Sequence, residues 1–422
     1  MRFKVCGGNR LRGELKVQGA KNSILPILAA CVLLRGEVVL HNCPELSDVN
    51  SAMKILEHLG VKCEKDGDKI RVLCGCVNCS RVPEELMREM RSSIFFLGPI
   101  LSRCGVAEIS MPGGCELGPR PIDIHISALK KLGAKIVDER GVLSCRVEKK
   151  LKGTQIDLWF PSVGATENTI LAAVLAEGTT VITNAAREPE IVDLADFLNA
   201  CGARIYGAGD SRIVIDGVKE LRSCEYTIMP DRIVAVTFLC AAAITRGEIN
   251  LKGIKEEHIT SSLSHLEAAG CDINLCGEEL TLSCKNRPRA MNIIKTMPYP
   301  SFPTDAQAPM MSLASVCEGT TMFVETIFEN RYRHVCELMR MGADIKTEGK
   351  VAVVNGVQRL KGADVTCTDL RGGAALVLAA LSAEGESNIY SIEHIDRGYQ
   401  NLEKDMRALS LDVERIEYKT EK

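Results

Sequence analysis

The sequence predicts an α/β protein of six repeats, each about 70 residues long, in two similar domains with buried helices and outer sheets. Two phrases that recur in step support this prediction. The first, written HLGVKC in its first copy, has a small residue at Gly60 that returns after 73, 69, 68, 72 and 68 residues. The second, written RGEVVL in its first copy, has a glycine at Gly36 that returns after 69, 73, 69, 72 and 66 residues. Two independent phrases that keep one period over six copies are not explained by chance.

Each repeat opens with a segment that is apolar on all sides. The clearest examples are 23–34, 168–176, 234–244 and 373–383, which are rich in Ala and Leu and too long for ordinary strands. A helix without a polar face must be buried. We therefore expect one core helix in each repeat, with the sheets lying outside the helices.

The remaining elements of a repeat follow in a fixed order. The repeat glycine ends the apolar helix, and a short strand such as 179–184 comes next. An amphipathic helix such as 189–202 ends at the second glycine. A hairpin follows, and in 206–217 and 346–356 its turn carries Gly-Asp or Glu-Gly. The expected order is helix, strand, helix, strand, strand, strand.

The repeats also predict the domain boundaries. Three buried helices can fill the centre of one domain, so six repeats divide into two domains of three. The first apolar helix begins near residue 21 and the fourth near residue 231. We expect one domain at 21–229, and a second domain that combines 230–422 with the first strand in 1–20.

Composition excludes several classes of protein. Hydrophobic residues make up 46% and charged residues 25% of the 422 residues, as in ordinary globular proteins. The 52 basic and 55 acidic side chains nearly balance, which argues against a nucleic-acid partner. The longest apolar run, 24–34, is too short to span a membrane, and no secretory signal is visible at the N-terminus. A cytoplasmic location is expected.

The cysteines do not suggest a disulfide framework or a metal centre. A chain of this length does not need disulfides, so most of its 19 cysteines are expected to be reduced and buried. Cys63, Cys74, Cys76 and Cys79 form the one cluster, but they lack the paired spacing of a zinc site and a suitable His. No metal and no other cofactor is predicted.

If the repeats are equivalent, the starts of their buried helices are equivalent too. Helix N-termini carry unpaired N–H groups and partial positive charge, which suit anions. Asp231, Asp305 and Asp369 belong to the residue type favoured as N-caps. Lys21, Arg91 and Arg371 are cations where the helix dipole disfavours them, and an anionic ligand would resolve that conflict. The residues at the six starts are Lys21 and Asn22, Arg91 and Ser92, Ser162 to Thr166, Asp231 and Arg232, Thr304 and Asp305, and Asp369 with Arg371.

Two further features favour a site for anions. Arg120, Arg187, Arg331 and Arg397 follow the first strand of their repeats, and arginine matches carboxylate and phosphate with two-pronged contacts. Cys115 lies in the glycine-rich insertion 109–121 of the second repeat. A thiol on an exposed loop beside arginines would have a lowered pKa and could act as an acid or a nucleophile.

Ten segments spread over the whole chain carry a recognisable pattern. They are GAKNSILPIL (19–28), MRSSIFFLGP (90–99), PGGCELGPRPIDIHI (112–126), SVGATENT (162–169), NAAREPEIVD (184–193), PDRI (230–233), FPTDAQA (302–308), FENRYRHVCEL (328–338), TDLR (368–371) and HIDRGY (394–399). These segments closely resemble the UDP-N-acetylglucosamine 1-carboxyvinyltransferase family of enolpyruvyl transferases. The resemblance implies an inside-out α/β barrel whose two domains hold the active site in the cleft between them. It also implies that the enolpyruvyl group of phosphoenolpyruvate moves to the 3-hydroxyl of UDP-N-acetylglucosamine by addition and elimination, with release of phosphate, as the first committed step of peptidoglycan synthesis.

The resemblance also implies roles for individual residues. Cys115 matches the cysteine that protonates the methylene carbon, Asp305 the general base at the sugar hydroxyl, and Asp369 a carboxylate at the reacting centre. Lys21, Asn22, Arg120 and Arg397 match contacts to phosphoenolpyruvate. Contacts to the UDP-sugar are matched by Arg91, Arg120, Pro121, Ile122, Asp123, Ile124, Ser162, Val163, Gly164 and Ile327. Arg331 belongs to the closing arginines, and Arg371 lies next to the Asp369 position.

The sequence departs from the family pattern in two places. Phe160–Pro161 stands where some relatives have a Lys that reaches the diphosphate, and Gly372–Gly373 stands where a bulkier pair is common, which would loosen that helix start. Two alternatives stay open: enolpyruvyl transfer to shikimate 3-phosphate, and a non-catalytic paralogue that binds UDP-sugar. In the main interpretation the partners are the two small-molecule substrates, with no nucleic acid and no membrane.

Overall fold

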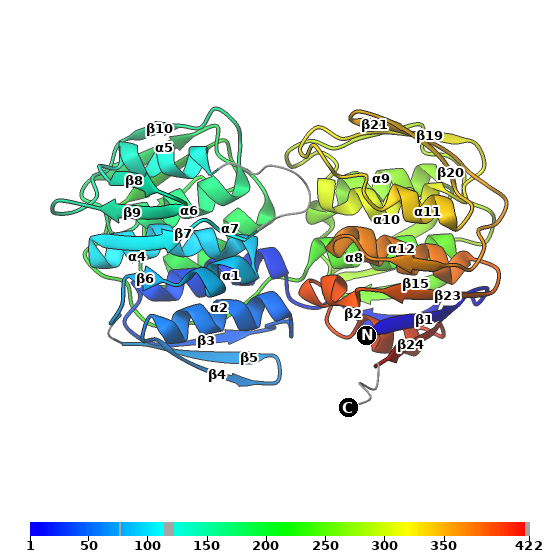
Figure 1. Cartoon of the computed structure of the whole chain (residues 1–422), viewed down its shortest axis with the longest axis horizontal. Helices are drawn as coiled ribbons and strands as arrows, with labels where there is room; N and C mark the ends of the chain where they lie inside the picture. The colour runs from blue at the N-terminus through cyan, green and yellow to red at the C-terminus, as the bar shows by residue number, and fades with distance from the viewer. Residues whose placement is uncertain (76, 114–121, 418–422) are drawn as a thin grey trace. The chain divides into compact units, whose positions relative to one another are not determined.

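The computed structural model describes residues 1–75, 77–113 and 122–417 (Figure 1). Contacts within the chain divide these residues into two compact parts. The first domain contains the described residues from 19 to 229, and the second contains residues 1–18 and 230–417. Each domain has its own hydrophobic core, and each core is built from three repeats.

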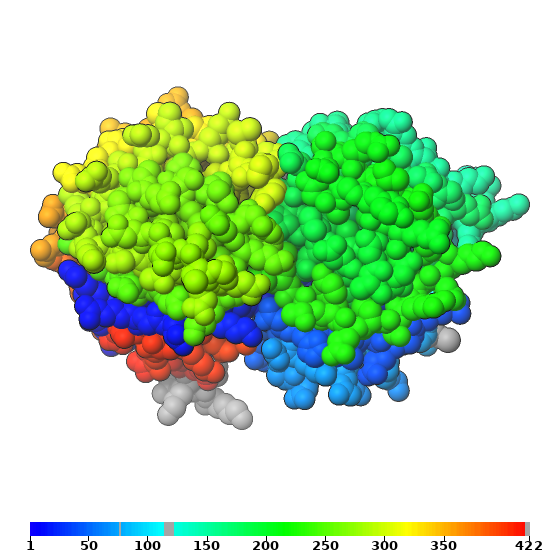
Figure 2. All heavy atoms as spheres, turned by 180° about the vertical axis from the view of Figure 1, so that it is seen from behind, coloured from blue at the N-terminus to red at the C-terminus, as the bar shows by residue number. Residues whose placement is uncertain are grey.

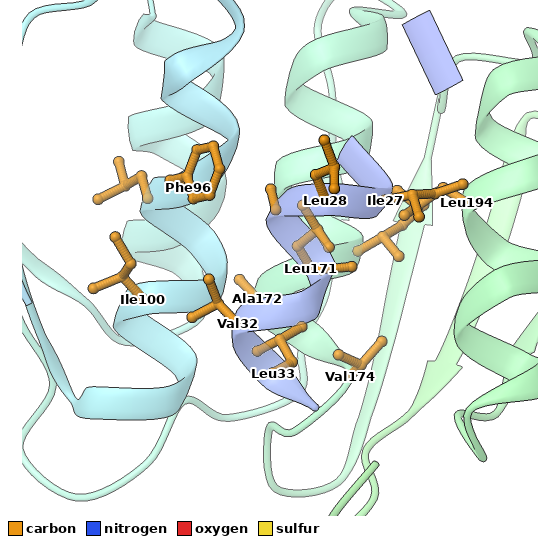
Figure 3. Packing of buried hydrophobic residues seen from close by; sticks show 14 of the residues in the cluster. Ile27, Leu28, Val32, Leu33, Phe96, Ile100, Leu171, Ala172, Val174 and Leu194 are labelled. Atoms are coloured by element: carbon orange, nitrogen blue, oxygen red, sulfur yellow. The ribbon is translucent and has the colours of Figure 1, made fainter. Parts of the chain in front are cut away.

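The core of the first domain is made of helices that are buried along most of their length. They are α1 (Lys21–Ala30), which continues into the 3-10 turn η1 (Cys31–Leu33), α4 (Leu97–Cys104), which follows the 3-10 helix η2 (Arg91–Phe96), and α6 (Val163–Ala173). Helix α4 contacts both η1 and α6. Figure 3 shows side chains of these segments, among them Leu28, Phe96 and Leu171, meeting in one apolar cluster. The second repeat therefore begins its buried segment with a 3-10 helix rather than with an α-helix.

The core of the second domain repeats this arrangement. Helices α8 (Arg232–Ile244), α10 (Gln307–Ala314) and α12 (Leu370–Ser382) contact one another pairwise, and every residue of α8 and α10 is buried. The 3-10 turn η4 (Thr304–Ala306) leads into α10. The prediction of one all-apolar core helix per repeat is confirmed.

The amphipathic helices and the strands complete each repeat in the predicted order. The helices are α2 (Ser47–His58), α5 (Asp123–Lys131), α7 (Pro189–Ala200), α9 (Thr260–Ala268), α11 (Val335–Arg340) and α13 (Leu402–Ala408). Three shorter helical segments are α3 (Glu84–Glu89), η3 (Glu256–His258) and η5 (Ile392–Arg397). On α2 the buried positions include Val49, Ala52 and Leu56, which recur at helical spacing, and its other face is exposed.

The strands form six separate four-stranded sheets, three in each domain. In the first domain their orders are β14 (Glu225–Thr227), β3 (Gly36–His41), β5 (Lys69–Cys74), β4 (Lys62–Asp66); β6 (Arg81–Val82), β7 (Val106–Ser110), β9 (Val142–Arg146), β8 (Lys135–Glu139); and β10 (Gln155–Asp157), β11 (Thr179–Thr183), β13 (Arg212–Asp216), β12 (Ile205–Tyr206). In the second domain they are β2 (Arg12–Lys16), β15 (Glu248–Lys252), β17 (Glu279–Ser283), β16 (Asp272–Cys276); β18 (Ile293–Lys295), β19 (Thr320–Val324), β21 (Val351–Asn355), β20 (Asp344–Glu348); and β22 (Asp364–Thr366), β23 (Glu386–Tyr390), β1 (Arg2–Cys6), β24 (Asp412–Ile416). In every sheet the first pair of strands is parallel and the others are antiparallel, so the sheets are mixed.

Strand pairing links the repeats of each domain into a cycle. The first strand of each sheet comes from the preceding repeat, and β14 at the end of the third repeat pairs with β3 of the first. In the second domain the N-terminal strands close the cycle: β2 pairs with β15, and β1 lies between β23 and β24. Figures 1 and 2 show this blue segment beside the orange and red end of the chain. The sheets described here remain separate, and no closed barrel is found among them.

The repeat glycines act as helix ends in most copies. Gly105 follows α4 in the left-handed conformation, with φ 73°. In the fourth repeat Arg246 takes this conformation instead, with φ 53°. Gly247 lies against the N-terminal segment, where an added Cβ would be 2.2 Å from the carbonyl oxygen of Leu11. This close approach explains why glycine is needed at residue 247 even though its φ is not left-handed.

The cysteines that the structure describes are all free thiols, and most of them are buried. Among the described residues, no group of three or more His, Cys, Asp or Glu side chains could hold a metal ion. Cys76 of the predicted cluster lies outside these residues. None of the described helices is both long and apolar enough to cross a membrane.

The core of the first domain can be tested with two leucines. Leu28 on α1 is fully buried in this core, whereas Leu73 on β5 is 42% exposed. Leu28→Ala should lower the free energy of unfolding by about 2–5 kcal/mol, because it removes apolar contacts and leaves a cavity. Leu73→Ala should change it by less than about 1 kcal/mol. Denaturant unfolding of the two variants measures both values, and equal losses would contradict the packing described here.

Candidate active site

An acidic side chain in the second domain is held by two buried arginines. The guanidinium groups of Arg331 and Arg371 lie 3.0 Å from Oδ1 and 3.3 Å from Oδ2 of Asp305, respectively. Arg331 also donates a hydrogen bond of 3.0 Å to the carbonyl oxygen of Thr304. The two arginine side chains are buried, but that of Asp305 is 28% exposed. The two arginines thus fix the orientation of the carboxylate, which remains partly accessible to solvent.

The three candidate N-caps behave differently. Asp231 accepts hydrogen bonds from the first N–H groups of α8, at 2.9 Å and 3.1 Å, and Asp369 does the same for α12, at 3.1 Å and 3.0 Å. The cap prediction is confirmed for these two residues. It is wrong for Asp305, which lies within η4, makes no cap and turns its side chain to the arginines.

The positive charge of Arg371 is stabilised by several neighbours. Its guanidinium lies 5.5 Å from the ring centroid of Tyr399, whose hydroxyl is 2.9 Å from Oγ1 of Thr237 in α8. Burial alone would lower the pKa of Arg371, but Tyr399, Asp305 and Asp231 together raise it above its ordinary value. The starts of α8, α10 and α12 therefore meet around a cation that stays charged.

A buried histidine packs behind the start of α12. His334 is fully buried, and burial lowers its pKa to about 4 despite the opposing effect of Asp369. An added Cβ on Gly372 would be 3.0 Å from Cβ of His334 and 2.7 Å from Oδ2 of Asp369. On Gly373 it would be 2.8 Å from Cγ1 of Ile395. The glycine pair is tightly packed, so the expectation of a loosened helix start is wrong.

Two other candidates of the second domain lie in loops that follow strands. Arg397 ends η5, is partly buried and precedes Gly398 and Tyr399. Ile327 follows β19, and its N–H donates a hydrogen bond of 2.8 Å to Oε1 of Glu325. Tyr399 thus places the η5 segment close to Arg371, and Glu325 fixes the backbone of Ile327.

In the first domain, the cation at the start of α1 has a carboxylate partner. Nζ of Lys21 lies 2.9 Å from Oδ2 of Asp48 in α2, and both side chains are buried. Ser23, two residues later, donates a hydrogen bond to Asp193 in α7. Asn22 is partly exposed between them. The carboxylate of Asp48 in α2 therefore compensates the cation that the helix dipole disfavours.

The starts of α5, α6 and η2 meet around a second buried histidine. Burial, and then the charge of Arg91, lower the pKa of His125 to about 3. Its Nδ1 is 3.1 Å from the side-chain amide of Asn168 in α6. A Cβ on Gly164 would lie 3.2 Å from the ring of His125 and 3.2 Å from that of Phe95, so a larger residue here would require these rings to shift. Ser162 caps α6 by accepting a 3.4 Å hydrogen bond from the N–H of Ala165.

The neighbouring candidates lie on the same elements. Ile122 precedes α5, Asp123 is its exposed first residue, and Ile124 is buried. Val163 is the first residue of α6 and is partly exposed. The structure thus brings together the candidates of 91, 122–124 and 162–164.

Some candidates are not part of these clusters. Cys115, Arg120 and Pro121 lie outside the described residues. Arg187 is exposed, and its Nε donates a hydrogen bond of 3.1 Å to the carbonyl oxygen of Gly209 in a hairpin turn. Its contact stabilises a turn of the first domain.

The sequence did not single out the buried polar residues that support the candidates. They are Asp48, His125, Asn168, Asp193, Glu325, His334 and Tyr399. Their partners lie far away in the chain, so spacing carries no signal for most of them. Glu325 is an exception, because it stands six residues after the repeat glycine Gly319, where the other repeats have Asn, Met, Gly or Ser.

Comparisons with known proteins agree with this architecture. The model of the EPSP synthase (3-phosphoshikimate 1-carboxyvinyltransferase) family matches residues 5–406. A relative named UDP-N-acetylglucosamine 1-carboxyvinyltransferase 2, from Caldanaerobacter subterraneus subsp. tengcongensis, is 52% identical over 98% of this chain and 99% of its own. UDP-N-acetylglucosamine 1-carboxyvinyltransferase 1 from Symbiobacterium thermophilum is also 52% identical, over 98% of this chain and 95% of its own.

Solved structures of similar fold come from related proteins. The enolpyruvyl transferase NikO from Streptomyces tendae superposes with a TM-score of 0.88 at 25% identity, over 98% of both chains. EPSP synthase from Acinetobacter baumannii superposes with a TM-score of 0.73 at 20% identity, over 98% of this chain and 100% of its own, and shows likeness of fold alone. The chain belongs to the EPSP synthase family of carboxyvinyltransferases, and its relatives at about half identity are UDP-N-acetylglucosamine 1-carboxyvinyltransferases.

The buried state of His334 predicts a pH dependence of stability. The pKa of His334 falls from 6.5 to about 4 on folding, so the unfolded chain binds a proton at pH 5 and the folded chain does not. This contribution to stability is complete above pH 6.5 and is lost as the pH falls towards 4. In His334→Gln, the fall in unfolding free energy from pH 7 to pH 5 should be smaller than in the wild type by about 2 kcal/mol. Urea unfolding at the two pH values measures this difference. His394→Gln, at a partly exposed histidine, is the control, and an equal change in both variants would contradict the prediction.

Proposed function

We propose that this chain transfers the enolpyruvyl group of phosphoenolpyruvate to the 3-hydroxyl of UDP-N-acetylglucosamine and releases phosphate. The observation that carries the proposal is the carboxylate of Asp305, held between Arg331 and Arg371 and partly open to solvent. A general base needs this combination of fixed orientation and access. The names of the relatives at 52% identity supply the two substrates.

Each reacting group has a residue in the proposed mechanism. Asp305 takes the proton of the sugar 3-hydroxyl as the oxygen attacks the second carbon of phosphoenolpyruvate. Cys115 gives a proton to the methylene carbon, so that a tetrahedral intermediate forms. Loss of a proton from the resulting methyl group and departure of phosphate then restore the double bond. Asp369 stabilises the positive charge that develops at the reacting carbon.

Cations and helix ends bind the substrate anions in this proposal. Lys21, Asn22, Arg120 and Arg397 contact the carboxylate and phosphate of phosphoenolpyruvate. The N–H groups at the start of α6, with Arg91, face the UDP-sugar, and the residues 120–124 and Ile327 complete its site. Phe160 is partly buried against the core and supplies no charge where some relatives have Lys, so the diphosphate depends more on Arg91.

The proposal extends to the arrangement of the whole protein. We propose that the six repeats form an inside-out α/β barrel with domains at 21–229 and at 1–20 plus 230–422. Residues from both domains act in one reaction, and closure of the domains would exclude water and strengthen the charged contacts. A cytoplasmic location fits the free thiols of the described cysteines.

An assay of phosphate release tests the proposed reaction. Phosphate should appear only when phosphoenolpyruvate and UDP-N-acetylglucosamine are both present, because the addition step needs the sugar hydroxyl. Asp305→Asn should lower kcat by a factor of about 100 or more, since the amide cannot accept the proton. Release with shikimate 3-phosphate in place of the UDP-sugar would support the EPSP synthase reaction and overturn the proposal. Binding of the UDP-sugar without turnover would support the non-catalytic alternative.

Covalent labelling tests the role of Cys115. The resemblance implies that the epoxide fosfomycin modifies this thiol, so the wild type should gain one adduct in intact-protein mass spectrometry. Cys115→Ser should gain none, although 18 other cysteines remain in the chain. Cys336→Ser, at an exposed free thiol, is the matched control and should be labelled like the wild type. An adduct that persists in Cys115→Ser would place the reactive thiol elsewhere.

A further inference from the structure

Glu325 is a buried acid whose carboxylate accepts four hydrogen bonds. It follows β19 directly and is 1% exposed. Its Oε1 accepts from Oγ1 of Thr296 at 2.9 Å and from the N–H groups of Ile327 and Phe328 at 2.8 Å and 3.1 Å. Its Oε2 accepts from Oγ1 of Thr304 at 3.0 Å. One side chain thus joins the end of β18, the loop after β19 and the turn η4.

Both ends of this network lead to candidate residues of the active site. On one side, Thr304 precedes Asp305, and the carbonyl oxygen of Thr304 accepts a hydrogen bond from Arg331. On the other side, Glu325 fixes the backbone of Ile327 and Phe328, and the guanidinium of Arg331 lies 5.5 Å from the ring centroid of Phe328. The hydrogen bonds of the Glu325 carboxylate described above go to Thr296, Thr304, Ile327 and Phe328. Glu325 therefore acts on the site through the segments that it holds.

Comparison among the repeats shows that this loop departs from the common pattern. Six residues after the repeat glycine, four repeats place a residue in the left-handed conformation, with φ between 53° and 76°: Asn42, Asn184, Gly253 and Ser391. Glu325 occupies this place in the fifth repeat and is not left-handed. Met111 of the second repeat is not left-handed either. The four left-handed copies need only a tight bend here, whereas the fifth repeat builds a loop around a carboxylate.

The partner of Glu325 departs from the pattern as well. The amides of Asn42 and Asn184 donate to the backbone carbonyls of Ile228 and Leu158, the residues that follow β14 and β10. The equivalent residue after β18 is Thr296, and Glu325 accepts from its hydroxyl. The ends of β18 and β19 thus remain connected by a side chain. In the fifth repeat this side chain is a carboxylate, which also accepts hydrogen bonds from three further donors. Burial of a carboxylate is costly, so a bend alone does not account for it.

We propose that Glu325 is a positioning residue for the sugar acceptor. Its carboxylate fixes the backbone of Ile327, a proposed contact to the UDP-sugar, relative to Thr304 and to Asp305, the proposed general base. The inference rests on the proposed function. The carboxylate of Glu325 binds Thr296, Thr304, Ile327 and Phe328. Phosphoenolpyruvate is assigned to a different set of residues: Lys21, Asn22, Arg120 and Arg397. The contribution of Glu325 should therefore fall on the UDP-sugar and not on phosphoenolpyruvate.

Steady-state kinetics of Glu325→Gln tests the inference. Glutamine keeps the shape but offers one acceptor oxygen in place of two and carries no charge, so the four donors can no longer all be satisfied. We expect KM for UDP-N-acetylglucosamine to rise about tenfold, as for the loss of one hydrogen bond to a charged group, while KM for phosphoenolpyruvate changes less than about twofold. A purely structural role would instead lower the amount of active enzyme, and so the apparent kcat, with both KM values unchanged.

A second pair of variants avoids changing the acid itself. Thr304→Val removes the hydroxyl that donates to Oε2, whereas Thr304→Ser keeps it. Thr304→Val should raise KM for the UDP-sugar several-fold, and Thr304→Ser should restore it to within about twofold of the wild type. Glu348→Gln, at an exposed acid at the end of β20, is the matched control and should behave like the wild type.

The outcomes separate this inference from the proposed function. A wild-type protein that does not release phosphate overturns both. An active wild type, in which Glu325→Gln and Thr304→Val leave KM for the UDP-sugar unchanged or raise both KM values equally, overturns the positioning role and leaves the proposed reaction intact. A selective rise in KM for the UDP-sugar that Thr304→Ser reverses supports the inference.

Discussion

A helix that is apolar on all sides has to be enclosed by other structure, and both domains are organised by this constraint. The chain meets it by packing three such helices together and placing six four-stranded sheets and the amphipathic helices around them. Asp231, Asp369 and Arg371 lie where two of these helices begin. In the second domain the starts of α8, α10 and α12 meet at Arg371, which is influenced by Asp231, Asp305 and Tyr399. The candidate site is thus a consequence of how the core is built.

Charges at such a place need partners within the protein. Removing an ion from water costs several kcal/mol, and an opposite charge with good geometry offsets much of this cost. Lys21 with Asp48, and Arg331 and Arg371 with Asp305, are pairs of this kind. Apolar residues would often be at least as stable at these positions. The pairs are therefore better explained by the proposed binding of anionic substrates than by stability, and the partial exposure of Asp305 fits the same explanation.

The sequence predicted the parts of the structure that depend on local patterns. The period of about 70 residues and the all-apolar segments predicted the core helices and the order of elements. Both predictions depend only on patterns within short stretches of sequence and on their repetition. Contacts between residues that lie far apart in the chain produce no local sequence pattern. Asp305 has the residue type of an N-cap, and only the positions of Arg331 and Arg371 show that it has another role. Likewise, Gly372 suggested a loose helix start, whereas His334 and Asp369 fill the space beside it. The resemblance implies an inside-out α/β barrel, and the described sheets form six separate mixed sheets in which no closed barrel is found.

The repeats make departures from symmetry informative. Most of the equivalent positions solve one structural problem in similar ways, as the left-handed residues six places after the repeat glycines show. A position that abandons the common solution for a costlier one needs a separate reason. Glu325 replaces a simple bend with a buried carboxylate and four hydrogen bonds, next to the turn that carries Asp305. The end of α8 shows a different kind of departure. There the left-handed residue is Arg246 instead of the repeat glycine Gly247, and the close approach of Gly247 to Leu11 accounts for this shift. The packing of the N-terminal segment therefore explains the departure at Arg246. It does not explain the one at Glu325, for which we propose a role in the chemistry of the site.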